Sequence, residues 1–292
     1  MTSPVIVAEI GGNHRGELGT ALRMVEIIGG YCTEHYQLDG HRPDVVVKFQ
    51  KRTPALYPTD YERPHPNAHH AYGDTYGAHR EALEFTGQEH AVLSEHCRAH
   101  GVGYACSAWD EPALDDIMGA APRWVKIPSA RNVDWPLLEH VVSRWDGDIH
   151  VSLGMVSRSE MDEIARFLEP SAERVTFYAC TSGYPVAFTD VRLGEILSLR
   201  ARYGRFGAIG FSGHHHGIAV DMAAVALGAK YIERHFTLNR TWRGTDHSAS
   251  LEPDGFRRLV RDARAVAQAM GTKDGEPLAV ELEQRAKLAR TV

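Results

Sequence analysis

Two apolar runs of this 292-residue sequence end in histidine. Residues 208–212 lead into His214, and residues 230–234 lead into His235. At the ends of neighbouring parallel strands, two imidazoles can share one divalent metal ion. Asp246 follows closely and is a candidate for orienting a ligand or moving a proton. A single histidine at a strand end is usually an ordinary hydrogen-bonded residue, but two at successive strand ends beside a carboxylate favour a functional site.

Two lysines lie inside otherwise apolar runs. Lys48 stands between Val47 and Phe49, and Lys126 stands between two aliphatic residues. Burying an ammonium group without an anion is costly, so these positions call for an anionic partner. With the serines that follow nearby runs, the lysines predict a site for a phosphate or a carboxylate. Together with the two histidines, they indicate metal-assisted chemistry on a small phosphorylated acid.

Short apolar runs alternate with helical patterns along the whole chain. The strand-like runs cover residues 4–10, 44–50, 102–107, 124–128, 150–154, 175–180, 206–211 and 231–236. The helical patterns cover 18–28, 81–100, 111–118, 134–145, a segment beginning at Ser157, 190–203, 218–227 and 252–270. Residues 52–80 are irregular, and so long a loop in a compact domain is either a functional lid or an insertion.

Eight strand–helix units predict an α/β protein with a single (β/α)8 TIM barrel. An open doubly wound sheet usually has fewer units and a glycine-rich nucleotide loop, and the sequence contains neither G-x-G-x-x-G nor G-x-x-x-x-G-K-[ST]. Active sites of such barrels lie at the C-terminal ends of the strands. Polar residues end every predicted strand: Glu9 with Asn13 and His14, Lys48 with Gln50, Ser107 with Asp110, Lys126 with Ser129, Ser152, Thr181 with Ser182 and Tyr184, Ser212 with His214, and His235.

Composition places the chain among ordinary globular proteins. Hydrophobic residues make up 43% and charged residues 24%, and the formal net charge of -6 argues against a nucleic-acid partner held by a general basic field. The four cysteines form no Cys-x-x-Cys pair and are expected to be reduced thiols of a cytoplasmic protein. No signal peptide and no apolar run long enough to span a membrane are apparent.

Seven motifs together resemble the sialic acid synthase family, most closely its animal-type members, over nearly the whole chain. They begin at Ala8 (AEIGGNHRG), Val47 (VKFQ), Val125 (VKIPS), Ser152 (SLGM), Cys180 (CTSGYP), Phe211 (FSGH) and Glu233 (ERHFT). The resemblance implies condensation of phosphoenolpyruvate with N-acetylmannosamine or a related sugar aldehyde, release of phosphate, and a 2-keto-3-deoxy sugar acid as product. It also implies a divalent metal, most commonly Mn²⁺ with Mg²⁺ or Co²⁺ as alternatives, and a homodimer.

The resemblance assigns a role to each matched position. His214 and His235 would bind the metal, and Glu9 would act in proton transfer. Phosphoenolpyruvate would be held by Lys48, Ser107, Lys126, Ser129, Ser152, Ser182 and Ser212. The sugar would face Gln50, Tyr184 and Asp246.

Two features differ from many family members. Gly213 stands where many bacterial members have aspartate, as it does in animal-type members. The family usually adds a small antifreeze-like domain after the barrel, whereas this sequence ends at Val292. We therefore expect a barrel domain over residues 1–275 and a C-terminal linker stub over 276–292, without that domain. Five histidines outside the motifs are expected to be solvated loop residues: His65, His69, His70, His215 and His216.

Two other functions fit the residues. A metal-dependent barrel aldolase or isomerase would use the histidines but would not need buried lysines, because a neutral sugar brings no anion. A non-catalytic sugar-binding barrel would need neither metal nor phosphoenolpyruvate. The exact acceptor, and whether it is phosphorylated, stays open at this point.

Overall fold

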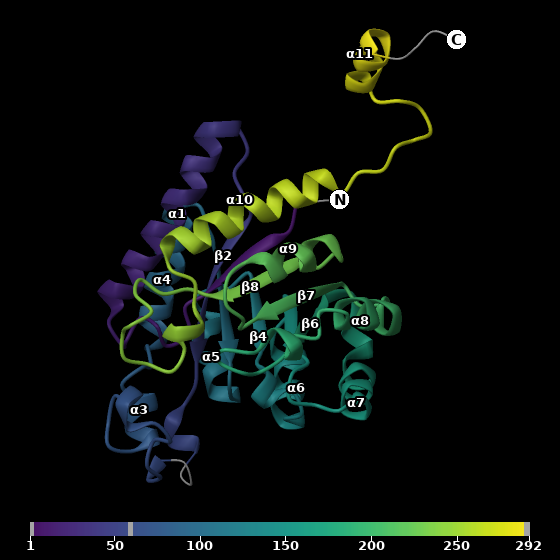
Figure 1. The fold of residues 1–292 in the computed structure, drawn as a ribbon. Helices are drawn as coiled ribbons and strands as arrows, with labels where there is room; N and C mark the ends of the chain where they lie inside the picture. Colours follow the sequence, from purple (N-terminus) through teal and green to yellow (C-terminus); the bar gives the residue numbers. More distant parts are fainter. Residues whose placement is uncertain (1–2, 58–60, 289–292) are drawn as a thin grey trace.

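The computed structural model describes residues 3–57 and 61–288, which form a closed parallel barrel of eight strands in chain order (Figure 1). This confirms the predicted (β/α)8 fold. The strands are β1 (Val5–Glu9), β2 (Val45–Lys51), β3 (Gly103–Ala108), β4 (Trp124–Ile127), β5 (Asp148–Ser152), β6 (Val175–Cys180), β7 (Ala208–Gly213) and β8 (Tyr231–His235).

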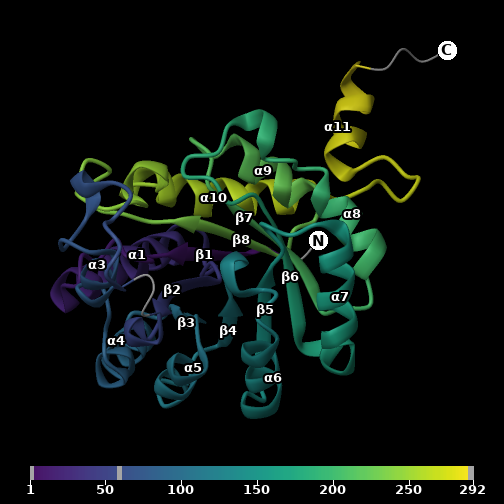
Figure 2. The same ribbon diagram turned by 90° about the horizontal axis from the view of Figure 1, so that it is seen from below.

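Helices surround the strands, as Figure 2 shows from a second direction. They are α1 (Leu18–Asp39), α3 (Tyr76–Glu81), α4 (Gly87–Ala99), α5 (Glu111–Met118), α6 (Trp135–Arg144), α7 (Arg158–Leu168), α8 (Glu195–Tyr203), α9 (Ala219–Ala226), α10 (Pro253–Ala269) and α11 (Ala279–Leu288). The last helix has no buried residue and lies apart from the barrel in both views. None of the described helices combines the length and apolar character that a bilayer span requires.

One predicted helix begins six residues later than expected. The pattern over residues 81–100 predicts one helix, but α4 begins at Gly87, and α3, which ends at Glu81, lies almost entirely in the stretch 52–80 that was predicted to be irregular. The break occurs at Thr86, whose hydroxyl accepts a hydrogen bond from the backbone N–H of Glu89 while the Glu89 carboxylate accepts one from the N–H of Thr86. This reciprocal capping box starts a new helix instead of continuing the old one.

Side chains alternate strictly across each strand, because successive residues of a strand point to opposite faces. On the outer face, aliphatic and aromatic residues pack beneath the helices as one large core. A smaller apolar cluster includes Val7, Val46 and Trp124. Trp124 of β4 contacts the ring of Tyr231 of β8, and these strands lie across the barrel from each other, so this cluster fills the barrel interior.

The interior changes character along the barrel. Its N-terminal half is apolar and aromatic, and Gly210 has no side chain there because a Cβ at that position would lie 2.6 Å from the Tyr178 ring. Two residues further along β7 the inward position is Ser212. On β1 to β4 the alternation therefore leads from an apolar interior residue to a polar one at the C-terminal mouth, whereas the deeper interior residue of β5 is His150.

Candidate active site

One cavity of about 380 Å³ opens at the C-terminal mouth of the barrel. All thirteen residues predicted for the site line it: Glu9, Lys48, Gln50, Ser107, Lys126, Ser129, Ser152, Ser182, Tyr184, Ser212, His214, His235 and Asp246. The segment after β2 forms a further wall through His65, Asn67, Tyr76 and Arg80, so the long irregular loop is part of the site.

Other polar residues at the strand ends hold loops instead. Asn13 donates to the carbonyl of Phe236 at 2.8 Å. His14 stacks on Phe85 with ring centroids 4.2 Å apart. Asp110 caps α5 by accepting from the N–H of Ala113 at 2.9 Å. These three do not line the cavity, and their role is to position the mouth.

Four charged groups form a buried cluster at the floor of the cavity. Lys48 forms an ion pair with Glu9, and its Nζ lies 3.7 Å from Oε2 of Glu233. Across the barrel, Nζ of Lys126 lies 2.6 Å from Oε1 of Glu233. Ser212 donates to the same oxygen at 3.1 Å. Two ammonium groups and two carboxylates therefore balance in charge within one connected network.

The ionisation of this cluster follows from its pairing. Burial by itself would raise the pKa of Glu233, but the ammonium groups of Lys126 and Lys48 lower it to about 2. Burial also acts to lower the pKa of Lys48, yet Glu233 and Glu9 raise it above its usual value. For Lys126, burial and the neighbouring charge of Lys48 prevail and lower the pKa. Glu233 is therefore an anion at neutral pH.

Glu233 changes the interpretation of the lysines. The buried lysines predict an anionic ligand, but Glu9 and Glu233 supply protein carboxylates to both ammonium groups. An ion pair across the barrel leaves no local trace in the sequence, so these carboxylates could not be recognised as partners of the lysines. A signal for Glu233 itself existed, since it stands two residues before His235 and shares its inward face of β8.

Serine hydroxyls converge beside the lysines. Ser107 accepts a hydrogen bond from Lys48 Nζ at 2.9 Å. After β5, Gly154 leaves room for two more serines, because a Cβ at that position would lie 2.7 Å from Oγ of Ser129 and 2.8 Å from Oγ of Ser182. The hydroxyl and ammonium donors together form a surface suited to phosphate or carboxylate oxygens.

His214 and His235 lie side by side on the cavity wall, with ring centroids 5.5 Å apart. Nδ1 of His214 lies 3.0 Å from the carbonyl oxygen of Thr181, which can only accept, so Nδ1 carries the proton and Nε2 keeps its lone pair. Burial, followed by the charge of His235, lowers the pKa of His214 to about 3 and keeps the ring neutral. Nδ1 of His235 is buried without a hydrogen-bond partner and lies 3.9 Å from Asp246 Oδ2.

These features fit a divalent metal ion. A neutral imidazole with one nitrogen tied to a carbonyl is the usual form of a histidine ligand. A separate group of possible ligands, Glu26, His96 and His100, lies on α1 and at the C-terminal end of α4, away from the cavity.

The side chains of Glu9, Gln50 and Asp246 meet beside Gly11. A Cβ at Gly11, whose φ is +55°, would lie 3.2–3.3 Å from atoms of Gln50, Asp246 and Glu9. Gln50 donates to Oε1 of Glu9 at 2.6 Å. Tyr184 packs against the His214 ring at 4.3 Å, and burial raises the pKa of its phenol, which stays protonated. This side of the cavity offers the mixed donors and acceptors that a sugar needs.

The five histidines outside the motifs differ in exposure. His69 and His216 are exposed, as expected, and His70 is half-buried. The expectation of solvated loop residues was wrong for His65 and His215. His65 is buried and stacks on Tyr76, while His215 is fully buried outside the barrel wall, where Arg234 donates to its Nε2 at 3.0 Å. His65 packs against Tyr76 eleven residues later, and His215 contacts Arg234 of the next strand, so neither partner is visible in the adjacent sequence.

The chain is similar to known sugar-acid synthases over nearly its whole length. The family model described as "NeuB family" matches residues 43–275. Human N-acetylneuraminate-9-phosphate synthase is 34% identical over 98% of this chain and 77% of its own length. N,N'-diacetyllegionaminic acid synthase from Legionella pneumophila is 29% identical over 98% of this chain and 79% of its own.

A solved structure agrees with these relatives. The crystal structure of N-acetylneuraminic acid synthetase from Leptospira borgpetersenii in complex with citrate superposes with a TM-score of 0.80 at 27% identity, covering 99% of this chain and 94% of the other. The matched residues include seven of the eight strands and the cavity they surround. The chain therefore belongs to the NeuB family, the family of the sialic acid synthases, as its motifs predicted.

Proposed function

We propose that this protein condenses phosphoenolpyruvate with the open-chain aldehyde of an N-acetylmannosamine-like sugar. C3 of phosphoenolpyruvate forms a bond to the aldehyde carbon, water adds at C2, and the C2–O bond to phosphate breaks. The products are inorganic phosphate and a 2-keto-3-deoxy sugar acid. The observation that carries the proposal is that a lysine–serine surface and a histidine pair line one cavity in a chain whose relatives are named as such synthases.

Phosphoenolpyruvate is assigned to the lysine–serine side. Glu233 holds Lys126 in place, and Glu9 holds Lys48, so both ammonium groups are oriented before a ligand arrives. Donors already placed for the substrate's oxygens need little reorganisation during the reaction. In this assignment Ser107, Ser129, Ser152, Ser182 and Ser212 supply the remaining hydrogen bonds to the phosphate and the carboxylate.

The metal is assigned to His214 and His235. A divalent ion, with Mn²⁺ as the first candidate and Mg²⁺ or Co²⁺ as alternatives, would act as a Lewis acid toward the sugar's carbonyl oxygen. Thr181 fixes the tautomer of His214, and Asp246 lies where it can orient His235.

Glu9 is assigned to proton transfer. Its carboxylate accepts from Gln50 and pairs with Lys48, so it lies between the sugar side and the phosphoenolpyruvate side of the cavity. A carboxylate in that position can pass a proton toward the oxygen that becomes a hydroxyl group. Gln50, Tyr184 and Asp246 are assigned to the sugar.

The structure weakens one argument against the alternative of a metal-dependent aldolase or isomerase. Since Glu9 and Glu233 neutralise the lysines, the lysines alone no longer demand an anionic substrate. The preference for the synthase over an aldolase or isomerase now rests on membership of the NeuB family. The homodimer, the cytoplasmic location and the domain boundary at residue 275 remain predictions.

The test is phosphate release from phosphoenolpyruvate in the presence of Mn²⁺ across a panel of aldoses. We expect release that depends on one sugar, is lost with a chelator and returns with added metal. His235→Ala should lower the rate at least a hundredfold, whereas the exposed His69→Ala should match wild type. Phosphoenolpyruvate that neither reacts nor protects the protein from heat would refute the proposal.

A further inference from the structure

Three side chains with metal-binding atoms meet on the outside of the barrel, between α1 and α4. Glu26 lies on α1, His96 lies in the last turn of α4, and His100 is the C-cap of that helix. One ligand atom of each side chain lies within 4.8 Å of the ligand atoms of the other two. We call this group the α1–α4 site (Glu26, His96 and His100). Neither the motifs nor the proposed roles involve it.

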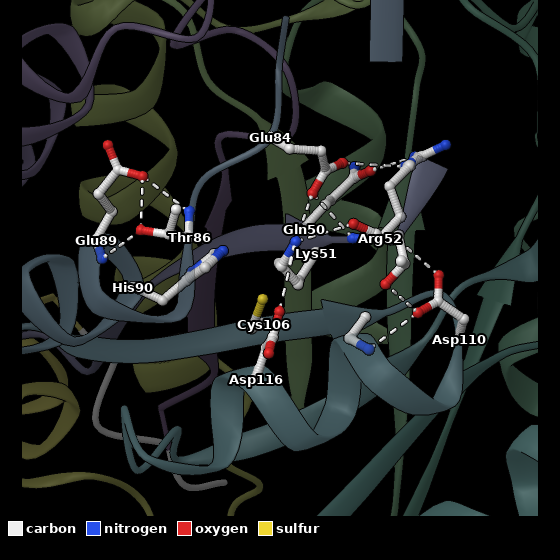
Figure 3. Close-up of polar contacts among 12 residues, drawn as sticks. Gln50, Lys51, Arg52, Glu84, Thr86, Glu89, His90, Cys106, Asp110 and Asp116 are labelled. Carbon is white, nitrogen blue, oxygen red and sulfur yellow. Dashed lines mark hydrogen bonds and ion pairs between the residues drawn. The ribbon is translucent and has the colours of Figure 1, made fainter. Parts of the chain in front are cut away.

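The sequence of α4 places the two histidines on one face of the helix. The helix starts at the capping box formed by Thr86 and Glu89 (Figure 3), and Cys97 is fully buried in the core. This phase puts His96 at the edge of the buried face, one turn from His100. Their ring centroids lie 4.5 Å apart. Two histidines four residues apart on a helix present their rings to one side, which is a recurrent zinc-binding arrangement.

A glycine of α1 lets Glu26 reach these histidines. A Cβ at Gly29 would lie 2.7 Å from Cβ of His100 and 2.9 Å from its carbonyl oxygen, so a larger residue would push the two helices apart. Glu26 comes three residues before Gly29, on the same face of α1. Arg42 donates to the carbonyl oxygens of His100 at 2.7 Å and of Gly101 at 3.0 Å. The end of α4 is therefore fixed against α1 by contacts within the protein.

The ligand atoms are available for binding. Nε2 of His96 is buried and has no hydrogen-bond partner within residues 3–57 and 61–288. Oε1 of Glu26 lies 3.7 Å from this nitrogen, too far for a hydrogen bond, while Oε2 accepts from Arg23 at 3.0 Å, which orients the carboxylate. A tetrahedral zinc ion holds its ligand atoms about 3.3 Å apart, so small side-chain rotations would complete the site. A groove of about 590 Å³, lined by Glu26 and His100, gives an entry path.

We infer that the α1–α4 site binds a divalent transition-metal ion, Zn²⁺, through the two imidazoles and the carboxylate. Two histidines, one carboxylate and a water molecule are an established donor set for zinc. Imidazole donors favour Zn²⁺ over Mn²⁺, and carboxylate or water oxygens alone would suit Mg²⁺ better. The ion would cross-link α1 to α4 and stabilise the folded protein. The inference does not rest on the proposed function, because none of the three residues lines the cavity.

Equilibrium dialysis against Zn²⁺ tests the inference by counting the ions that wild type and its variants bind. His96→Gln should bind one equivalent fewer, with the affinity for that equivalent lowered at least about a hundredfold, because even side chains outside the ligand set contribute tenfold to a hundredfold. Only the difference is used, so ions at the barrel mouth do not affect the result. His140→Gln is the matched control: His140 faces the Asp115 carboxylate at 3.1 Å, but no third ligand among the described residues joins them.

Thermal unfolding gives a second readout. At a hundredfold excess of Zn²⁺ over the dissociation constant, the melting temperature of wild type should rise about 5 °C more than that of His96→Gln. Glu26→Gln and His100→Gln should lose the same part of the rise, whereas all three variants should melt close to wild type in a chelator. Equal zinc counts in wild type and His96→Gln would overturn the inference. A zinc-dependent rise that survives in all three variants would overturn it as well.

Discussion

Strand β8 carries two buried charge networks on its two faces, one residue apart. Glu233 points into the barrel and pairs with Lys126 and Lys48, whereas Arg234 points outward and pairs with Asp221 of α9. Both networks bury full charges. They differ in what lies beside them, because the inner one borders the cavity and the outer one borders only protein.

The outer network has fixed partners. The side chains of Arg234, Asp221 and His215 are 0% exposed. Arg234 also donates to the backbone carbonyls of His215 and Gly217, which belong to the loop that follows His214. The terminal nitrogens of Arg234 thus hold the β7–α9 loop, while its Nε and Oδ1 of Asp221 are buried without a hydrogen-bond partner, and neither residue lines the cavity.

The inner network keeps some freedom. The side chains of Lys126 and Glu233 retain 4% and 6% exposure, and both line the cavity. Water or a substrate can therefore take over part of the pairing when one member is lost. Two adjacent buried charges can thus have different roles: the outer network stabilises the fold, and the inner one prepares a site.

The largest effect is expected from a variant that breaks the inner network. Lys126→Gln removes a donor proposed to hold phosphoenolpyruvate, so kcat/KM should fall by about two to three orders of magnitude. The free energy of unfolding from urea titration should change much less than it does for the outer network. Lys273→Gln, an exposed lysine paired with Glu281, is the control. Equal losses of stability in the inner and outer variants would contradict the comparison.

Breaking the outer network should reverse that pattern. Arg234→Gln leaves Asp221 buried without its ion-pair partner, so the free energy of unfolding should fall by about 3–5 kcal/mol. Activity per folded molecule should fall less than in Lys126→Gln. Adding Asp221→Asn to Arg234→Gln should recover part of the stability, because the unpaired charge is then gone. A double variant no more stable than the single one would argue against the pairing.

As the pH falls, buried histidines should reduce the free energy of unfolding before either charge network is affected. Burial lowers the pKa of His14 and of His90 to about 3 in the folded protein, whereas unfolded histidines titrate near 6.5. The unfolded chain therefore binds more protons between these values, and stability is lost as the pH falls below about 6.5, by at most about 1.4 kcal/mol per pH unit for each such group. Glu233, whose pKa is lowered to about 2, contributes stability that is lost only below about pH 4.5.

Urea titrations between pH 7 and pH 5 would check this smallest effect. His90→Gln should reduce the slope of unfolding free energy against pH by about 1.4 kcal/mol per unit at most. His69→Gln, at an exposed position, should leave the slope unchanged. An unchanged slope in His90→Gln would show that this histidine does not drive the acid sensitivity.

Much of the fold and of the mouth was predictable from the sequence. The alternation of apolar runs with helical patterns specified eight units, and a barrel places the last inward residue of each strand at one end. Lys48, Lys126, Ser212 and His235 could be recognised because a polar residue interrupts or ends an apolar run. The same rule would have identified Glu233 from its spacing to His235.

What the sequence alone determined is which strand residues reach the barrel mouth, because their direction depends on period-two alternation along each strand. Only the tertiary structure decided which charges neutralise each other. Lys126 and Glu233 are 107 residues apart and meet across the barrel. Such pairings depend on distances in space, and a linear pattern carries no record of them.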